Sequence, residues 1–121
     1  MGTRSNIYVE TEPGTYLGTY CHYDGYPDHM FPVISKMNND ELLGHILIAM
    51  PHGGIRNLDR EKTDYLDDGT CVLMFNPHME DWAPDYIWIK CHDGSVKWRH
   101  CGDTEWFTTQ RDPWSYEDKY G

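Results

Sequence analysis

The residues in this chain best suited to chemistry are cysteines and histidines that stand next to each other. They are the pairs Cys91-His92 and His100-Cys101, with Cys21, His22 and His29 further upstream. A structural zinc ion needs about four such ligands at roughly 2.0–2.3 Å. A two-residue turn at Asp93-Gly94 would hold the two pairs roughly 15 Å apart along a β-ladder, at about 3.3 Å per residue. We therefore expect no metal site, and a small zinc-binding module with ligands from other segments stays an alternative.

A second group of residues suggests acid–base chemistry. His22 and Asp24 would share one face of a strand, where a carboxylate can orient an imidazole, and His29 follows them. No nucleophile with a positioned base accompanies them, and the run Asp24-Gly25-Tyr26-Pro27 is typical of a turn. Gly53-Gly54 follows a helical pattern instead of opening one, which disfavours a phosphate-binding loop. We expect neither an enzyme nor a cofactor.

The Asp93-Gly94 hairpin also predicts a basic and aromatic surface. A two-residue turn would place Trp88 opposite Arg99, in a cation–π arrangement, on the face away from the core. This face is either covered by a helix or the tail, with Trp88 packed, or it is a recognition surface, because Trp, Tyr and Arg are enriched at interfaces. Tyr23 and Tyr26 are two further large aromatic residues, at positions next to a predicted turn. The candidate binding residues are Tyr23, Tyr26, Trp88, Lys90, Lys97 and Arg99.

One stretch carries a resemblance to a known family. The run YCHYDGYP at 20–27, with IYVE at 7–10 before it and DELLGHILIAMPHGGIRNLD at 40–59 after it, resembles small uncharacterised bacteriophage proteins with a Tyr-Cys/Val-His-aromatic-Asp-Gly-Tyr-Pro signature. The resemblance covers roughly residues 5–100 with gaps. It implies a viral accessory protein in the host cytoplasm and a fold class, but no activity. Residues 28–31 depart from the acidic-glycine stretch that is common in the family.

Composition limits the function classes that remain. The 121 residues fit one domain, 1–121, and 39% hydrophobic and 14% aromatic content predicts a folded chain. The chain has a net charge of −10, so we do not expect it to bind nucleic acids nonspecifically. The first ten residues contain no apolar signal region, and no window approaches the ~18 apolar residues of a membrane span. Without a secretion signal, the four cysteines are expected to be thiols.

The expected elements follow from periodicity and turn residues. Residues 5–10 and 15–23 are expected to form a hairpin. Two helices are expected after it. The first is capped by Asp28 and tolerates Pro32 only in its first turn, and the second is capped by Asn38 or Asn39. Residues 55–68 are expected to be a surface connection, 70–75 a central strand, 85–101 a hairpin, 104–109 an edge strand and 111–121 a loose tail. The expected core comprises Leu43, Ile46, Leu47, Ile87, Ile89 and Trp98.

These elements predict an α+β fold with a mostly antiparallel, hairpin-rich sheet of about five strands and one or two helices packed on one face. Three function classes compete. The first is a non-catalytic phage protein that binds and inhibits a host protein complex. The alternatives are a binder of a small anionic ligand, such as a nucleotide signal, and the small zinc-binding module.

Overall fold

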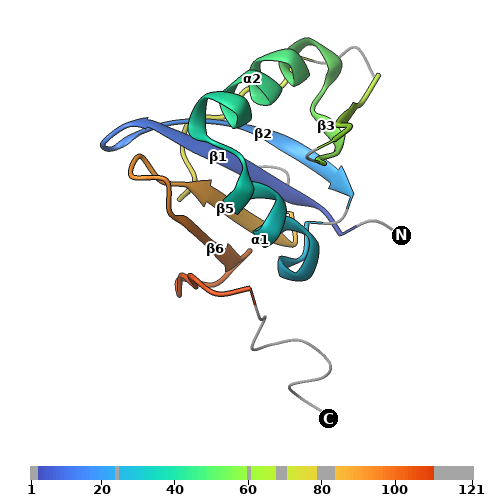
Figure 1. The fold of residues 1–121 in the computed structure, drawn as a ribbon. Helices are drawn as coiled ribbons and strands as arrows, with labels where there is room; N and C mark the ends of the chain where they lie inside the picture. The colour runs from blue at the N-terminus through green and yellow to red at the C-terminus, as the bar shows by residue number, and fades with distance from the viewer. Residues whose placement is uncertain (1–2, 24, 60, 68–70, 79–83, 111–121) are drawn as a thin grey trace.

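One of the two middle strands of the sheet is β1 (Ser5–Glu12), which pairs with β2 on one side and β5 on the other. The computed structural model describes residues 3–23, 25–59, 61–67, 71–78 and 84–110. The other elements are β2 (Thr15–Tyr23), α1 (Pro27–Lys36), α2 (Asn39–Ala49), the 3₁₀ helix η1 (Met50–His52), β3 (Ile55–Asn57), β4 (Asp64–Tyr65), β5 (Tyr86–Lys90) and β6 (Val96–His100). The strands form one sheet of six in the order β4-β3-β2-β1-β5-β6 (Figure 1).

The sheet is mixed. The predicted hairpins β1–β2 and β5–β6 are present and antiparallel, as is β3–β4. Parallel pairs, β1 with β5 and β2 with β3, join these hairpins, so the sheet is less uniformly antiparallel than predicted. A parallel pair needs a long crossover, which the two helices provide for β2 and β3. The α+β class is confirmed, and both helices pack on one face of the sheet (Figure 1).

The two helices begin as their sequences require. In α2 the Asn38 side chain accepts a hydrogen bond from the Glu41 N–H at 2.8 Å, which confirms the predicted cap. In α1 Pro27 stands at the first helical position, where its missing N–H costs nothing. Pro32 lies in the interior of α1, not in the first turn where we expected it to be tolerated. The prediction failed because the helix starts earlier, at Pro27 instead of after Asp28.

The face of the sheet under the helices, here called the helix face, holds the larger core. Met30, Ile34 and Met37 from the first helical segment and Leu42, Ile46 and Ala49 from α2 pack there on Ile7, Val9, Cys21, Ile55, Leu58, Trp88, Val96 and Trp98. Leu43 packs at the margin of this core. The prediction for Leu47 was wrong, because its side chain is 46% exposed. One residue further along a helix turns the side chain by about 100°, and Ile46 already points at the sheet.

The opposite face, here called the rear face, carries a smaller core of Tyr8, Val72, Met74, Ile87 and Ile89. Residues 71–78 cover it, and in the described residues the predicted strand 70–75 is reduced to one bridge between Gly18 and Met74. Tyr8 explains the close approach of this segment, because its hydroxyl donates to the Asn76 carbonyl at 3.3 Å. A Cβ at Gly18 would lie 2.4 Å from the Tyr8 ring, so only glycine fits beneath it.

Two further predicted elements differ from the structure, and a third lies outside the described residues. The connection 55–68 holds two short strands, β3 and β4. The expected edge strand 104–109 is a single bridge between Phe107 and Trp98. The expected loose tail, 111–121, lies outside the described residues. Within the described ranges, no helix has the length and apolar character needed to cross a membrane.

Candidate functional site

The β5–β6 hairpin differs from its predicted register by one residue. Trp88 lies opposite Trp98, and Lys90 lies opposite Val96. The loop spans 91–95 instead of two residues, because the Asp93 carboxylate accepts bonds from the Ser95 N–H and hydroxyl and the Cys91 N–H donates to the Ser95 carbonyl at 2.7 Å. A shift of one residue moves a whole strand to the other face. The predicted common face for Trp88, Lys90, Lys97 and Arg99 is therefore wrong.

Trp88 is fully buried on the helix face, so the covered-face interpretation is the right one for it. Its indole N–H donates to the Gly25 carbonyl at 2.8 Å. Its ring lies 5.8 Å from that of Trp98 and 6.4 Å from that of Phe31 on α1. This indole is packed between sheet and helix, where no binding partner reaches it.

Lys90 shares the helix face and is also buried. Its ammonium group donates to the Gly94 carbonyl at 2.8 Å, within its own hairpin loop. Burial lowers the pKa of Lys90, because the charged form loses its water. The side chain stabilises the loop and does not contribute to a surface patch.

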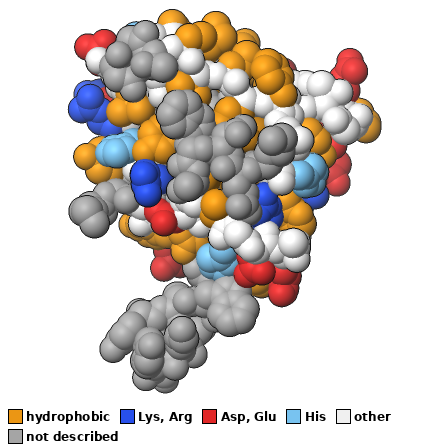
Figure 2. Space-filling model, turned by 180° about the vertical axis from the view of Figure 1, so that it is seen from behind, with side chains coloured by type: hydrophobic (Ala, Val, Ile, Leu, Met, Phe, Trp, Pro, Cys, Tyr) orange, Lys and Arg blue, Asp and Glu red, His pale blue; other side chains and the backbone are white. Residues whose placement is uncertain are grey.

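Arg99 and Lys97 lie on the rear face, next to Trp106. The Arg99 guanidinium lies 5.4 Å from the centroid of the Trp106 ring, and the Lys97 ammonium lies 5.0 Å from it. Arg99 is buried and donates to the carbonyls of Asp103 at 2.8 Å and Pro77 at 3.1 Å. It therefore joins the segment at Pro77 to the turn after β6. Figure 2 shows the rear face, where hydrophobic, basic and histidine side chains are interspersed.

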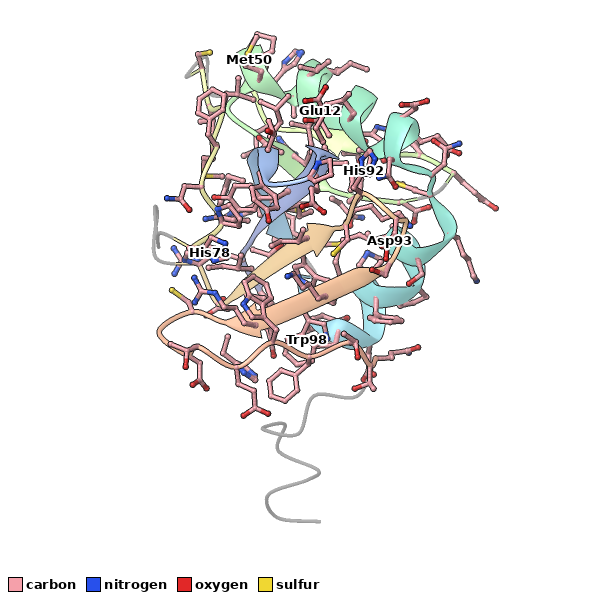
Figure 3. All side chains as sticks on the ribbon, turned by 90° about the vertical axis from the view of Figure 1, so that its left-hand side faces the viewer. Glu12, Met50, His78, His92, Asp93 and Trp98 are labelled. Atoms are coloured by element: carbon pink, nitrogen blue, oxygen red, sulfur yellow. The ribbon has the colours of Figure 1, made fainter. Side chains whose placement is uncertain are left out.

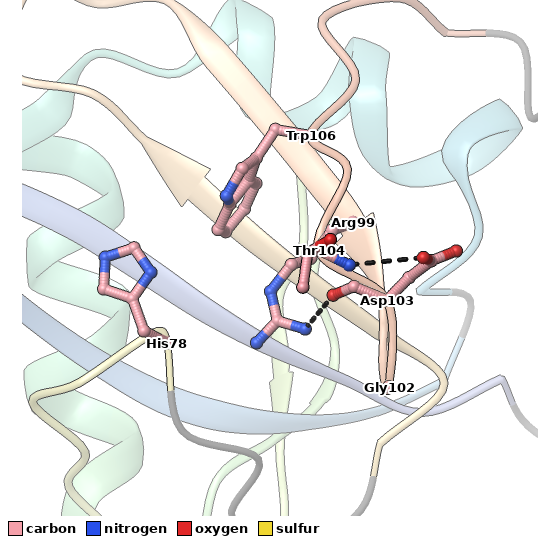
Figure 4. Close-up of a pocket in the computed structure, with 6 residues that line it drawn as sticks. All are labelled: His78, Arg99, Gly102, Asp103, Thr104 and Trp106. Atoms are coloured by element: carbon pink, nitrogen blue, oxygen red, sulfur yellow. Dashed lines mark hydrogen bonds between the residues drawn. The ribbon is translucent and has the colours of Figure 1, made fainter.

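A pocket of about 210 Å³ opens beside this arginine (Figure 4). Its wall consists of His78, Arg99, Gly102, Asp103, Thr104 and Trp106. Edge-on, His78 lies on the side of the sheet away from the helices (Figure 3), and its ring meets that of Trp106 edge to face at 6.1 Å. Neither His78 nor Trp106 is predictable as a site residue from the sequence, because both lie in segments without periodicity.

Tyr23 and Tyr26 are the predicted binding residues that are most accessible. Their side chains are 40% and 39% exposed. Tyr23 is the last residue of β2, and its ring packs edge to face on His22 at 4.5 Å. Tyr26 precedes α1, and its carbonyl accepts the N–H groups of His29 and Met30. Both rings are thus held by backbone structure while much of their surface faces solvent.

An acidic pocket lies next to these tyrosines. It measures about 560 Å³ and is lined by Asp28, His29, Pro32, Val33, Asp59 and Glu61. Tyr26 connects to it, because its ring lies 6.3 Å from that of His29. Tyr23 pairs with Asn57, two residues before Asp59. We call Tyr23, Tyr26 and this pocket lining the acidic tyrosine surface. Among the described residues, three carboxylates line its pocket and no Lys or Arg does.

The Cys and His side chains of the described residues do not gather in one place. The described residues contain no group of three or more metal-ligating side chains, and the four cysteines are thiols. His22 lies 2.7 Å from the Tyr20 hydroxyl through its Nδ1 atom, and His29 lies 3.0 Å from the Leu58 carbonyl through its Nε2 atom. Asp24, the predicted carboxylate partner of His22, lies outside the described residues.

Comparison with known proteins adds nothing to this geometry. No protein-family model, curated protein or solved structure matches the chain. The resemblance to the phage proteins therefore stays a prediction from the run at 20–27.

Proposed function

We propose that the protein is a non-catalytic binding module that captures another protein through the acidic tyrosine surface. The resemblance at 20–27 suggests its setting: a phage accessory protein that inhibits a host factor in the host cytoplasm. The single observation that carries the proposal is the pair of exposed tyrosines, Tyr23 and Tyr26, beside a pocket lined by three carboxylates. Tyrosine side chains supply large, rigid contacts and are enriched among residues that dominate binding energies.

The charge of the surface selects the kind of partner. Asp28, Asp59 and Glu61 face the pocket, and the whole chain has a net charge of −10. A basic protein surface is attracted from a distance by such a field and is then oriented on it. The host factor is therefore a protein with exposed Lys and Arg side chains, such as one whose own ligand is acidic.

The proposal is tested by removing the two rings. Tyr23→Ala with Tyr26→Ala should leave the circular dichroism spectrum unchanged, because neither ring belongs to the buried core and the hydrogen bonds to the Tyr26 carbonyl persist. Loss of one hot-spot residue costs about 2 kcal/mol or more, so affinity for the partner should fall by at least roughly 30-fold when both rings are removed.

The matched control is Phe75→Ala, which removes a ring that is 62% exposed elsewhere on the molecule. The tagged wild type, the tyrosine variant and the control are used in parallel to capture bacterial proteins. A partner that binds the wild type and the control but not the tyrosine variant supports the proposal. If captured proteins bind all three equally, binding through this surface is wrong.

Charge reversal separates the carboxylates from the rings. Asp59→Lys with Glu61→Lys should slow association with the captured partner and flatten the dependence of its rate on salt, because rim charges act mainly on the on-rate. If the variant associates at an unchanged rate at low salt, the partner is not recognised through basic side chains. The role of the tyrosines would be unaffected by that result.

Binding of a small anionic ligand is a second candidate function. The observation that favours it is the rear pocket, which is lined by Arg99, Trp106 and His78, with the Lys97 ammonium 5.0 Å from the centroid of the Trp106 ring. The pocket also contains the Asp103 side chain, which opposes an anion. Inorganic phosphate and nucleoside monophosphates should raise the melting temperature if this candidate is right, and a Trp106→Ala variant should lose that shift.

A further inference from the structure

A row of basic side chains crosses the rear face at the end of the sheet where β1 begins and β2 ends. Cys21 on β2 faces the helices and pairs with Ser5 and Ile55 on the strands beside it. Because side chains alternate along a strand, the residues next to these three point to the rear face. At the same end of the sheet, these residues are Arg4 just before β1, His22 on β2 and Arg56 on β3. Figure 2 shows basic and histidine side chains together on the left of this face.

The two arginines of this row are exposed, and within the described part of the chain no ion pair involves either guanidinium. Neighbouring strands lie about 4.8 Å apart, so Arg4 and Arg56, on opposite sides of β2, start roughly 10 Å from each other. Their long side chains can converge above His22. Carboxylates stand outside the row: Asp85 on β5, which accepts the Arg4 N–H at 3.0 Å, and Asp64 on β4. An anion is therefore favoured between the two guanidinium groups and not beyond either of them.

Two tyrosines hold the His22 ring between these arginines. The Tyr20 hydroxyl lies 2.7 Å from Nδ1 of His22, and the Tyr23 ring meets the imidazole edge to face at 4.5 Å. Burial raises the pKa of Tyr20, so its hydroxyl keeps its proton and serves as the donor to Nδ1. The neutral imidazole then carries its proton on Nε2, at the other side of the ring. His22 therefore adds a third N–H donor to the row.

We propose that Arg4, His22 and Arg56 bind a doubly charged phosphate group, free or as a monoester, between the two guanidinium groups and above the imidazole. Such a group carries a charge of about −1.5 to −2 near neutral pH and has at least three oxygens that accept hydrogen bonds. Guanidinium groups pair with phosphate oxygens in a bidentate manner. A carboxylate has two oxygens and a single charge, so it would leave part of the row unused. The site borders the acidic tyrosine surface at Tyr23 but takes a ligand of the opposite charge.

Titration of the full chain, followed by nuclear magnetic resonance at physiological salt, tests the site directly. Inorganic phosphate and methyl phosphate should shift the ring signals of His22 and the Nε–H signals of Arg4 and Arg56 in a saturable way. Tighter binding of methyl phosphate identifies a phosphorylated molecule as the ligand, and tighter binding of inorganic phosphate identifies the free ion. Dimethyl phosphate, with one charge, should bind about tenfold more weakly or worse. Equal binding of dimethyl phosphate overturns the preference for two charges, and a titration that leaves His22 unshifted overturns the site.

Single charge removals show whether the row or the net charge attracts the anion. Arg4→Gln and Arg56→Gln should each weaken phosphate binding about tenfold, because each removes a charge-assisted, bidentate contact. Both arginines are exposed, so the circular dichroism spectra should not change. Lys36→Gln removes an exposed positive charge from the last turn of α1 and is the matched control, with an affinity like that of the wild type. Equal weakening by all three variants overturns the proposal.

Two further variants separate the role of His22 and the location of the ligand. Tyr20→Phe removes the hydroxyl that holds Nδ1, so the ring nitrogen shifts of His22 should change and phosphate affinity should fall, by less than in the arginine variants. A wild-type ring protonated on Nδ1 alone would overturn the assigned set of donors. Trp106→Ala, in the rear pocket, should leave the response of His22 to phosphate intact, whether or not that pocket binds an anion. Loss of the response in this variant would overturn the location of the ligand at the row.

Discussion

The two faces of the β5–β6 hairpin are held against the rest of the protein in different ways. On the helix face, Trp88 and Trp98 lie in a fully buried aromatic layer under the helices. On the rear face, Arg99 reaches two irregular segments and holds them through their carbonyl oxygens, while Trp106 covers it. The helix face depends on shape and buried area, and the rear face on hydrogen bonds and cation–π contacts to irregular chain.

This difference teaches where the molecule tolerates change. A packed aromatic layer loses both buried area and filled volume when a ring is removed. A face covered by irregular chain can open locally while the remainder stays folded, because the covering segment buries only Val72 and Met74, fewer apolar side chains than the two helices bury. Substitutions on the helix face should therefore cause the larger loss of unfolding free energy, and substitutions on the rear face should cause local opening.

The largest expected effect is on the helix face. Trp88→Ala should lower the free energy of unfolding by about 3–5 kcal/mol, as measured by chemical denaturation, because it leaves a large cavity beneath α1 and the Gly25 carbonyl without its donor. Trp106→Ala, an indole on the rear face, is the control and should cost less. Equal losses would erase the distinction between the faces.

Arg99→Ala should come second, at about 2–3 kcal/mol, because hydrogen bonds from charged donors are lost. Its signature should be local: amide hydrogen exchange should accelerate at Gly18 and Met74, whose bridge ties the covering segment to β2. Uniform acceleration across α1 and α2 instead would show that the rear cover is part of one cooperative core.

A smaller effect concerns the two hairpin tips, which lie side by side (Figure 1). The Glu10 carboxylate accepts N–H bonds from Gly14 at 3.0 Å and His92 at 2.8 Å, and these bonds lower the pKa of Glu10. A carboxyl whose pKa is lowered by folding stabilises the protein above its unfolded pKa, and this contribution is lost as pH falls towards the lowered value.

Glu10→Gln should therefore cost about 1 kcal/mol at neutral pH and almost nothing in acid, by denaturation at several pH values. An identical cost at neutral and acidic pH would show that the charge of Glu10 plays no part in joining the tips.

The smallest effect should occur on the outer side of α2. Leu47→Ala should change the free energy of unfolding by no more than about 0.5 kcal/mol, because the side chain is 46% exposed and Ala favours helix. Ile46→Ala, one position earlier and buried, should cost about 2–5 kcal/mol in the same measurement. Reversed magnitudes would mean that the helix is rotated about its axis.

Local signals in the sequence predicted much of the fold. Pro13-Gly14 predicted the first hairpin, and Asn38 with Asp40-Glu41 predicted the start of α2. The parallel pairing of β1 with β5 leaves no local trace, because the partners are far apart in the chain. The register of β5 and β6 depended on hydrogen bonds inside a five-residue loop, and Asp-Gly alone does not determine loop length.

Some residues of the candidate sites were likewise predictable from local signals, and others were not. Tyr23 and Tyr26 were predicted as exposed aromatics from the turn residues beside them, and they are exposed. Trp88 and Lys90 were assigned to a surface by alternation in a register that was shifted by one residue. Trp106 belongs to the rear pocket through its tertiary contacts with Lys97 and Arg99. The segment that contains Trp106 has no periodicity from which these contacts could be predicted.

The central position of β1 has a consequence for the order of events during synthesis. This strand pairs with the distant strand β5, where Ser5 lies opposite Tyr86, and just before β1 the Arg4 N–H donates to the Asp85 side chain, 81 positions later. A nascent chain can form the β1–β2 hairpin early, but one side of β1 keeps unpaired backbone groups until β5 has left the ribosome. During that interval Ile7 and Val9 lack the Trp88 layer. The chain is then most open to wrong pairing and to chaperones.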